Sequence, residues 1–386
     1  MSTSLRATLI LFISLLLAGC GVFSRDDDEL EPAELVEFTP TLSVERQWST
    51  NTGRGMSTSR PNFRPFQEGN RLWVGDYRGR VVAVNADSGR IERSFSTDLD
   101  LSAGPAVQDG LIMLGTFDGK LVVLDDESGE RKWSAQLSSE VLSYPILHDD
   151  VIIVRCIDGR VFGFDASNGR RIWVHDRSVP LLTLRGTSDP LVRAGQVFIG
   201  YDDGMVNALR VADGSVLWEQ RVSDPEGRTE LERLADIDGP MAIVGTELYV
   251  VTYRGRMAGM ALESGRLLWV KEAASHSGLS LRRTSLAAAD RDDAVWLIDR
   301  RNGATLWRDD RLERRRITRP VFYDNQLVVV DVEGYMHFYD VDSGEFVART
   351  RATRNAPANA PLVVGNTLYL LDEDGTLSAW RASPHS

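Results

Sequence analysis

A glycine followed four residues later by a tryptophan recurs along this chain, and this spacing constrains the fold more than any other feature. The pairs are Gly129 and Trp133, Gly169 and Trp173, Gly214 and Trp218, Gly265 and Trp269, and Gly303 and Trp307. Each glycine closes a turn after an apolar run, as in LVVLDDESGERKW. A unit of short strands that recurs about every 40 residues is typical of a β-propeller and argues against a single-core enzyme fold.

Eight units align on the residue that opens the third strand of each. These residues are Gly79, Gly119, Gly159, Gly204, Gly255, Asp293, Gly334 and Gly375. They are separated by 40, 40, 45, 51, 38, 41 and 41 residues, which suits a four-stranded blade. Asp-Gly pairs at several of these turns favour tight hairpins. The sequence therefore predicts an all-β fold, an eight-bladed β-propeller of four-stranded blades over residues 41–386.

The two ends of the chain indicate how the ring closes. The C-terminus supplies three strands, APLVVGN, TLYLLDE and TLSAWRA, without a fourth. The N-terminus supplies one strand without partners, LSVERQWST at 42–50. We expect this strand to close the last blade, with Trp48 at the position of the repeated tryptophan. Arg93 and Ala348 stand at that position in blades 1 and 7. The tryptophans themselves are interpreted as packing between neighbouring blades.

Residues 1–20 have the features of a bacterial secretory leader. Arg6 precedes an apolar stretch of 11 residues, which is too short to span a bilayer. The stretch ends in Leu-Ala-Gly-Cys at Cys20, which resembles a lipobox. The alternative is an ordinary signal peptide with a chance cysteine. The resemblance implies that residues 1–19 are removed, that Cys20 is lipidated, and that Gly21 directs the protein to the outer membrane, where it faces the periplasm.

Residues 20–40 are acidic and poor in strand signals, so we expect a flexible tether there.

Composition and motifs exclude several classes of function. The net charge of −12 argues against nucleic-acid binding. The five histidines lack the spacing of metal ligands, and the chain shows neither a catalytic Ser-His-Asp pattern nor a phosphate-binding loop. We therefore predict no catalytic residue, no metal and no cofactor. Cys156, in an apolar strand, is interpreted as a buried structural cysteine.

The two longest intervals point to a binding surface. They enlarge the connections at about 175–189 and 221–239, which leave neighbouring blades on the same face. Aliphatic side chains flanked by charges in such loops are typical of a protein-binding patch. The alternative is that the leucines fold inward and cover the rim. The candidate partner-binding residues are Leu182, Leu184, Arg185, Asp236 and Asp238.

The blades resemble the quinoprotein (PQQ-dehydrogenase-like) repeat. Enzymes of that family carry, by resemblance, an adjacent cysteine pair, a bound Ca²⁺ and a stacking tryptophan, and this chain has no Cys-Cys pair. The lipobox, acidic tether, eight blades and the loop motifs LTLR and ADID together resemble the BamB family of the outer-membrane β-barrel assembly (BAM) complex. That resemblance implies docking of Leu182, Leu184, Arg185, Asp236 and Asp238 on a periplasmic POTRA domain of BamA.

The resulting hypothesis is a non-enzymatic, lipid-anchored scaffold that assists the folding and insertion of outer-membrane proteins. Unfolded outer-membrane chains are possible clients, because an extended chain can add to the outer strand of a blade. Two alternatives remain open at this point. One is a periplasmic quinoprotein-like enzyme with a degenerate cofactor site, and the other is a propeller lipoprotein that binds another envelope component such as peptidoglycan.

Overall fold

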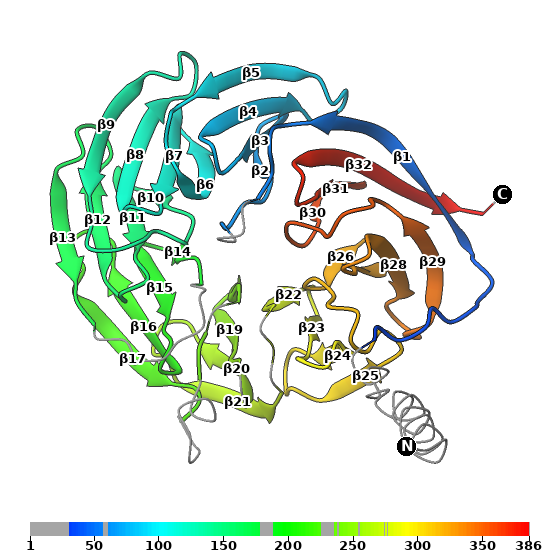
Figure 1. Ribbon diagram of the computed structural model, residues 1–386. Coiled ribbons are helices and arrows are strands. Elements are labelled where there is room, and N and C mark those ends of the chain that lie inside the picture. Colours follow the sequence, from blue (N-terminus) through cyan, green and yellow to red (C-terminus); the bar gives the residue numbers. More distant parts are fainter. Residues whose placement is uncertain are drawn as a thin grey trace, which may run out of the picture.

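The computed structural model describes residues 31–56, 61–177, 188–224, 235–237, 239–253, 255–273, 275 and 277–385. These residues form eight four-stranded antiparallel sheets arranged as a ring (Figure 1). Among them, no helix is long and apolar enough to cross a membrane. The predicted all-β, eight-bladed propeller is confirmed.

The strands of each blade run from the ring's centre to its outside. Blade 1 has β2 (Phe66–Glu68), β3 (Arg71–Gly75), β4 (Arg80–Asn85) and β5 (Ile91–Ser96), and blade 2 has β6 (Leu101–Gln108), β7 (Leu111–Thr116), β8 (Lys120–Asp125) and β9 (Arg131–Gln136). Blade 3 has β10 (Ile146–His148), β11 (Val151–Arg155), β12 (Val161–Asp165) and β13 (Arg171–His175), and blade 4 has β14 (Leu191–Arg193), β15 (Gln196–Gly200), β16 (Met205–Arg210) and β17 (Val216–Arg221). Blade 5 has β18 (Ala242–Val244), β19 (Glu247–Val251), β20 (Arg256–Ala261) and β21 (Leu267–Glu272), and blade 6 has β22 (Leu279–Leu281), β23 (Ser285–Ala289), β24 (Val295–Asp299) and β25 (Thr305–Asp309). Blade 7 has β26 (Val321–Tyr323), β27 (Gln326–Val330), β28 (Tyr335–Asp340) and β29 (Phe346–Arg351), and blade 8 has β30 (Leu362–Val364), β31 (Thr367–Leu371), β32 (Thr376–Pro384) and β1 (Leu42–Asn51).

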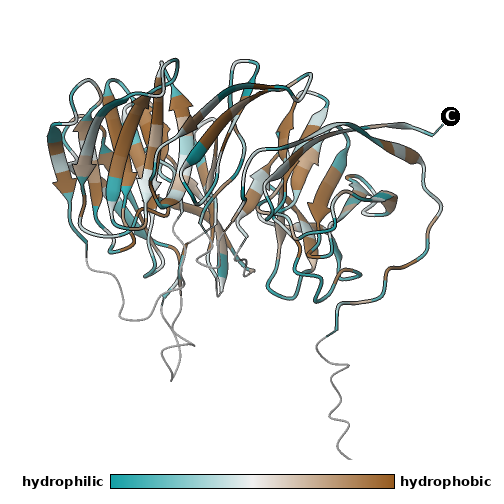
Figure 2. Cartoon of the chain, turned by 45° about the horizontal axis from the view of Figure 1, so that its top comes forward, coloured by the Kyte–Doolittle hydropathy of each residue, from teal (hydrophilic) through white to brown (hydrophobic). Residues whose placement is uncertain are grey.

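The hydrophobic core lies between the blades. The second and third strands of a blade are buried almost throughout, as in β7 and β8, because a neighbouring blade covers each of their faces. The fourth strand alternates between inward and exposed side chains, as in β9. Apolar residues therefore concentrate in the strands and hydrophilic ones in the turns at both ends of the blades (Figure 2).

Each repeated tryptophan joins its blade to the next one. The indole nitrogen donates a hydrogen bond to the carbonyl of the first residue after the third strand of the next blade. The pairs are Trp133 with Ala166 at 2.8 Å, Trp173 with Val211 at 2.8 Å, Trp218 with Leu262 at 3.0 Å, Trp269 with Arg300 at 2.8 Å and Trp307 with Val341 at 2.8 Å. A buried indole needs such an acceptor, so this bond fixes the tryptophan's position as well as its burial.

The glycine of the next turn makes room for the indole. Gly169 has a φ of +72°, and a Cβ added there would lie 2.6 Å from the ring of Trp133. Both the positive φ and the close approach exclude other residues. The glycine four residues before each tryptophan thus serves the preceding blade, whose indole it receives.

The two blades that lack a tryptophan meet this requirement in different ways. In blade 1, the guanidinium of Arg93 donates to the carbonyl of Asp126, and the ring of Phe95 covers Gly129. Blade 7 has Ala348 opposite Phe338, and both pack in one apolar cluster with Trp380 of blade 8. Its neighbour, blade 8, has no turn between its third and fourth strands, because β32 and β1 come from opposite ends of the chain. A tryptophan in blade 7 would therefore have no glycine turn to receive it.

The N-terminal strand closes the ring as predicted. β1 pairs with β32 along its whole length, from Leu42 opposite Pro384 to Asn51 opposite Thr376. Trp48 takes the repeated position, and its indole nitrogen donates to Ala86 of blade 1 at 3.0 Å. Figure 1 shows these two strands, from the two ends of the chain, side by side. All eight sheets are thereby complete.

Residues 31–40, which the sequence assigns to the tether, lie along blades 6 and 7. Ala33 donates its amide hydrogen to the carbonyl of Glu313 at 3.0 Å, and Arg349 donates to the carbonyl of Val36 at 3.0 Å. The ring of Phe38 packs against Phe346 at 5.5 Å between centroids. This part of the expected tether is therefore attached to the ring, a feature that its acidic composition does not signal.

We predict that Trp48→Ala lowers the free energy of unfolding by roughly 3 kcal/mol, at the low end for a packed aromatic residue, because blade 8 loses its junction with blade 1. Urea unfolding followed by tryptophan fluorescence and circular dichroism measures the change. Gln47→Ala is the matched control, since Gln47 is the exposed neighbour in the same strand. Equal stability of the two variants would show that the ring does not depend on this junction.

Candidate partner-binding surface

The structure describes only one of the five candidate residues. Leu182, Leu184 and Arg185 fall within 178–187 and Asp238 is a single position, and all four lie outside the described residues. Asp236 lies just before blade 5, and its side chain is only 1% exposed. The backbone carbonyl of Asp236 accepts a hydrogen bond from Tyr253 at 2.8 Å. Asp236 is therefore buried where the second connection joins blade 5, whereas the sequence suggested an exposed position on the rim.

The two enlarged connections return to the ring at the same place. Ser188 ends the first of them, and its hydroxyl donates to the carbonyl of Gly200 at 3.2 Å. Ile237 ends the second and is fully buried, with its amide donating to Tyr201 at 3.2 Å. A Cβ added to Gly200 would lie 2.5 Å from Ile237 and 3.1 Å from Ser188. The predicted proximity of the two connections therefore holds for their described ends.

A buried ion pair supports this junction. Arg155, at the end of β11, donates to Asp202 of blade 4 at 2.7 Å, and both side chains are almost completely buried. The guanidinium of Arg155 also donates to Ser188 at 3.3 Å. The ring of Tyr201 lies between two guanidinium groups, 5.2 Å from that of Arg155 and 5.0 Å from that of Arg177. The first connection is therefore held at its end by Arg155 and near its start by Arg177.

Arg177 is itself fixed by two acids of blade 4. Its guanidinium lies 2.6 Å from Asp203 and 3.1 Å from Glu219. Sequence reasoning did not identify this cluster. The available signals were an arginine inside the apolar run VIIVRC and the doubled aspartate in YDDG. A charge in a buried strand requires a partner, but only the three-dimensional structure shows which acid provides it.

Burial raises the pKa of Asp202, and the nearby Arg155 guanidinium opposes this shift. The folded protein thus binds a proton at Asp202 more tightly than the unfolded chain does. Stability from this group is greatest when the carboxyl is protonated, and it falls as the pH rises from the ordinary aspartate range through the raised pKa. When Asp202 is ionised, Arg155 is the group that compensates the buried negative charge.

The described residues contain no group of three or more histidine, cysteine, aspartate or glutamate side chains able to hold a metal ion. Cys156 is fully buried, as predicted, and burial raises the pKa of its thiol to about 11. A thiol with this pKa is protonated at neutral pH, so Cys156 has the properties of a structural residue.

A row of exposed aliphatic residues follows the outside of blades 3 to 6. In every blade, a β-bulge in the outer strand leaves one residue unpaired directly before the tryptophan position. In these four blades the bulged residue is aliphatic and exposed: Ile172 (37%), Leu217 (38%), Leu268 (39%) and Leu306 (55%). The same position holds Gln47, Glu92 and Lys132 in blades 8, 1 and 2, and the partly buried Val347 in blade 7. We call the first four residues the aliphatic row.

Comparison with known proteins identifies the family. The model of the family described as outer membrane protein assembly factor BamB matches residues 92–309 and 295–383. The outer membrane protein assembly factor BamB of Pseudomonas aeruginosa is 45% identical, over 95% of this chain and 97% of that protein. The corresponding protein of Escherichia coli is 34% identical, over 94% and 95%. The chain belongs to the BamB family.

Solved structures agree with this assignment. The crystal structure of BamB from Moraxella catarrhalis superposes with a TM-score of 0.80 at 27% identity, covering 88% of this chain and all of that one. A quinohemoprotein alcohol dehydrogenase from Pseudomonas putida superposes with a TM-score of 0.68 over 89% of this chain and 77% of that one, but at only 12% identity. The likeness to the dehydrogenase therefore extends to the fold alone.

We predict that Arg155→Met lowers the free energy of unfolding by about 3–5 kcal/mol, because it leaves Asp202 buried without a counter-charge. The loss should be larger at neutral pH than in mildly acidic buffer, where the carboxyl takes up a proton. The double variant Arg155→Met, Asp202→Leu should be more stable than Arg155→Met alone. Urea unfolding at two pH values measures all three proteins, and strictly additive losses would contradict the ion-pair interpretation.

Proposed function

We propose that this protein is a non-enzymatic scaffold of the outer-membrane β-barrel assembly machinery and that it docks on a POTRA domain of BamA. The observation that carries the proposal is the convergence of the two enlarged connections around Gly200, above the buried pair of Arg155 and Asp202. A rigid base that presents two long loops at one point is suited to holding a partner. Membership of the BamB family supports the same role.

The proposed contacts come from both connections. Leu182 and Leu184 would insert into the partner, and Arg185 and Asp238 would form the charged rim. Asp236, which is buried, would instead hold the second connection in position beside Tyr253. This arrangement has the layout of a small hot spot, with apolar anchors inside a polar border.

The proposed location is the periplasmic side of the outer membrane. Removal of residues 1–19 and lipidation of Cys20 would anchor the chain, and several acyl chains give stable membrane attachment. Only the segment from Cys20 to residue 30 would then separate the lipid from residues 31–40, which are attached to blades 6 and 7. At no more than about 3.6 Å per residue, such a short tether would keep the ring close to the membrane surface.

We predict that Leu182→Ala combined with Leu184→Ala weakens binding to BamA by at least about 2 kcal/mol, the usual threshold of a hot spot. Arg185→Glu should also weaken binding, and more so at low salt, where charge interactions are less screened. A pull-down with the isolated POTRA domains and a melting curve are recorded for each variant.

Leu306→Ala is the matched control, because Leu306 is an exposed leucine of blade 6 outside both connections. The control should bind BamA normally. Normal binding by the double leucine variant would refute the proposed contacts. A loss of binding that accompanies a large fall in Tm would instead mean that the leucines fold inward.

The aliphatic row provides a surface for clients. Each of its residues sits on the outermost strand of a blade, whose outer edge carries unpaired backbone N–H and C=O groups. An unfolded outer-membrane strand could add to such an edge and place its apolar side chains against the row. The row spans blades 3 to 6, and the proposed docking loops emerge from within this arc.

We predict that Leu217→Glu combined with Leu268→Glu weakens client binding by roughly 2 kcal/mol, because two apolar contacts are replaced by charges. Light scattering measures how well each protein suppresses aggregation of a urea-unfolded outer-membrane protein after dilution. Glu92→Gln combined with Lys132→Gln changes the same bulge positions in blades 1 and 2 and should have no effect. Equal suppression by both variants would remove the aliphatic row from the proposal.

The remaining alternatives are distinguished by direct tests. A quinoprotein-like enzyme would change the absorbance of PQQ in the presence of Ca²⁺, and the scaffold would not. A pull-down from envelope extracts would recover BamA if the proposal holds. Recovery of peptidoglycan fragments in its place would favour a different envelope partner.

A further inference from the structure

The junction between blades 7 and 8 contains a pocket. This is the junction that lacks both the tryptophan, because Ala348 takes its place, and the receiving turn. The pocket has a volume of about 370 Å³, at the small end of the range for small-molecule sites. It is lined by Arg46, Ser49, Arg351, Ala352, Thr353, Arg354, Asn355, Leu370, Asp372, Thr376 and Ser378.

A β-bulge in β1 directs Arg46 into this pocket. Arg46 pairs with Trp380 and Trp48 with Ala379, so Gln47 is the extra residue. Residues two apart in a regular strand face the same side, but the bulge reverses this for Arg46 and Trp48. Trp48 therefore points to blade 1, while Arg46 and Ser49 face blade 7. The same strand closes the ring and supplies one wall of the pocket.

The pocket carries an excess of positive charge. Among the described residues, no carboxylate forms an ion pair with Arg46, Arg351 or Arg354, although many other arginines of the ring are paired. The only acid in the lining is Asp372, and donors surround it. Its Oδ1 accepts from the amides of Asp374 at 3.1 Å and Thr376 at 2.8 Å. Its Oδ2 accepts from the hydroxyl of Thr353 at 2.7 Å and the side-chain amide of Asn355 at 3.4 Å.

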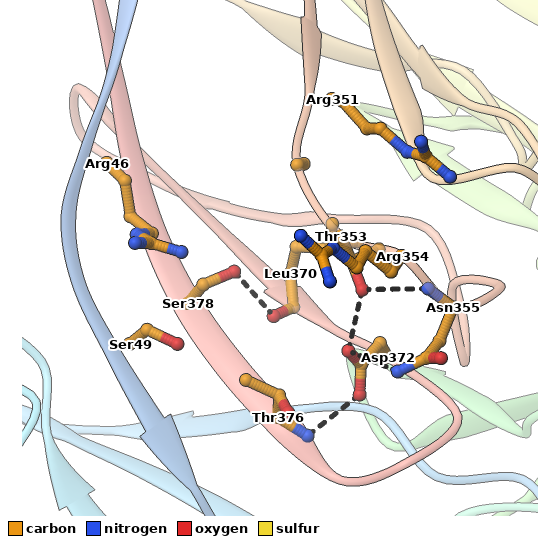
Figure 3. Close-up of a pocket in the computed structure, with 11 residues that line it drawn as sticks. Arg46, Ser49, Arg351, Thr353, Arg354, Asn355, Leu370, Asp372, Thr376 and Ser378 are labelled. Carbon is orange, nitrogen blue, oxygen red and sulfur yellow. Dashed lines mark hydrogen bonds between the residues drawn. The ribbon is translucent and has the colours of Figure 1, made fainter.

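Two of the arginines approach one another across the pocket. Arg46 extends from β1 and Arg354 from the segment after β29, and their guanidinium groups point into the space beside Ser378, whereas that of Arg351 turns away (Figure 3). Ser49 of β1 pairs with Ser378 of β32. The hydroxyl of Ser378 donates to the carbonyl of Leu370 at 3.4 Å and accepts from the indole of Trp380 at 2.9 Å, so Ser49 is the hydroxyl left to donate. Cationic forks from two directions, with a hydroxyl donor beside them, suit an anion with several oxygens.

We propose that this pocket binds a phosphate group through Arg46 and Arg354, with Ser49 as an additional donor. A phosphate presents more oxygens than a carboxylate, in tetrahedral directions and with a larger charge, so it is the anion best suited to engage both walls and the hydroxyl together. The phosphate could belong to a soluble ester or to a lipid headgroup. The site lies across the ring from blade 4 (Figure 1), so ligand binding there leaves the proposed docking loops free.

The test measures the affinity of the full-length protein for inorganic phosphate and for glycerol 3-phosphate by isothermal titration calorimetry at constant ionic strength. Arg46→Ala combined with Arg354→Ala should raise the dissociation constant about tenfold or more, since two charge-assisted contacts are lost. The matched control is Arg131→Ala combined with Arg171→Ala, which removes two exposed charges from blades 2 and 3 and should leave the affinity unchanged. Melting curves without ligand verify that both double variants are folded.

The source of the phosphate is tested with the full-length protein in phosphatidylcholine vesicles, with and without phosphatidylglycerol. A higher Tm with phosphatidylglycerol, lost in the Arg46, Arg354 double variant, supports a lipid headgroup. Binding of glycerol 3-phosphate without a vesicle effect supports a soluble ester. Absence of binding to any of these probes, equal affinity for acetate, or an equal loss in the control variant would overturn the proposal.

Discussion

The hydrogen bond from an indole to the backbone of the next blade is the interaction on which the ring depends. It joins two sheets that share no strand pairing, and it does so at the outer part of the wedge between them. The indole brings a large apolar surface, and its single N–H finds one carbonyl at a fixed place in the repeat. The glycine turn that receives the ring has no Cβ to displace it. A regular blade, such as blade 3, 4, 5 or 6, therefore contributes both the donor for one neighbour and the receiving turn for the other.

Because the two chain ends close the ring, the junction between blades 7 and 8 cannot have a tryptophan received by a glycine turn. β1 brings Trp48 to blade 1, so the junction between blades 8 and 1 is regular. Blade 8 has no turn between β32 and β1, so blade 7 has no partner for an indole. Ala348 therefore stands where a tryptophan would have no receiving turn, and it packs in one apolar cluster with Trp380 of blade 8. Leu42 packs against the apolar cluster between blades 7 and 8, and Phe38 packs against the one between blades 6 and 7.

Much of this architecture could be predicted because it repeats. The recurring glycine and tryptophan indicated a propeller, the residues that open the third strands indicated eight blades, and the unpaired strand around Trp48 indicated how the ring closes. Interactions that occur once could not be found in this way. Arg93 performs the task of a tryptophan with a different side chain, and residues 31–40 attach to the ring through backbone groups that any sequence carries. The pairing of Arg155 with Asp202 joins two blades, and only the folded ring brings these positions together.

The ring separates its surfaces because each blade contacts mainly its two neighbours. A change at one junction is then transmitted weakly to a distant one, as in other repeat architectures. The base of the docking loops lies between blades 3 and 5, the aliphatic row lies on the outer edges of blades 3 to 6, and the arginine pocket lies between blades 7 and 8. Substitutions in the pocket and in the loop base are more than one blade apart and share no partner, so their effects on stability should add. The three proposed surfaces therefore lie far enough apart on the ring that occupying one should leave the other two free.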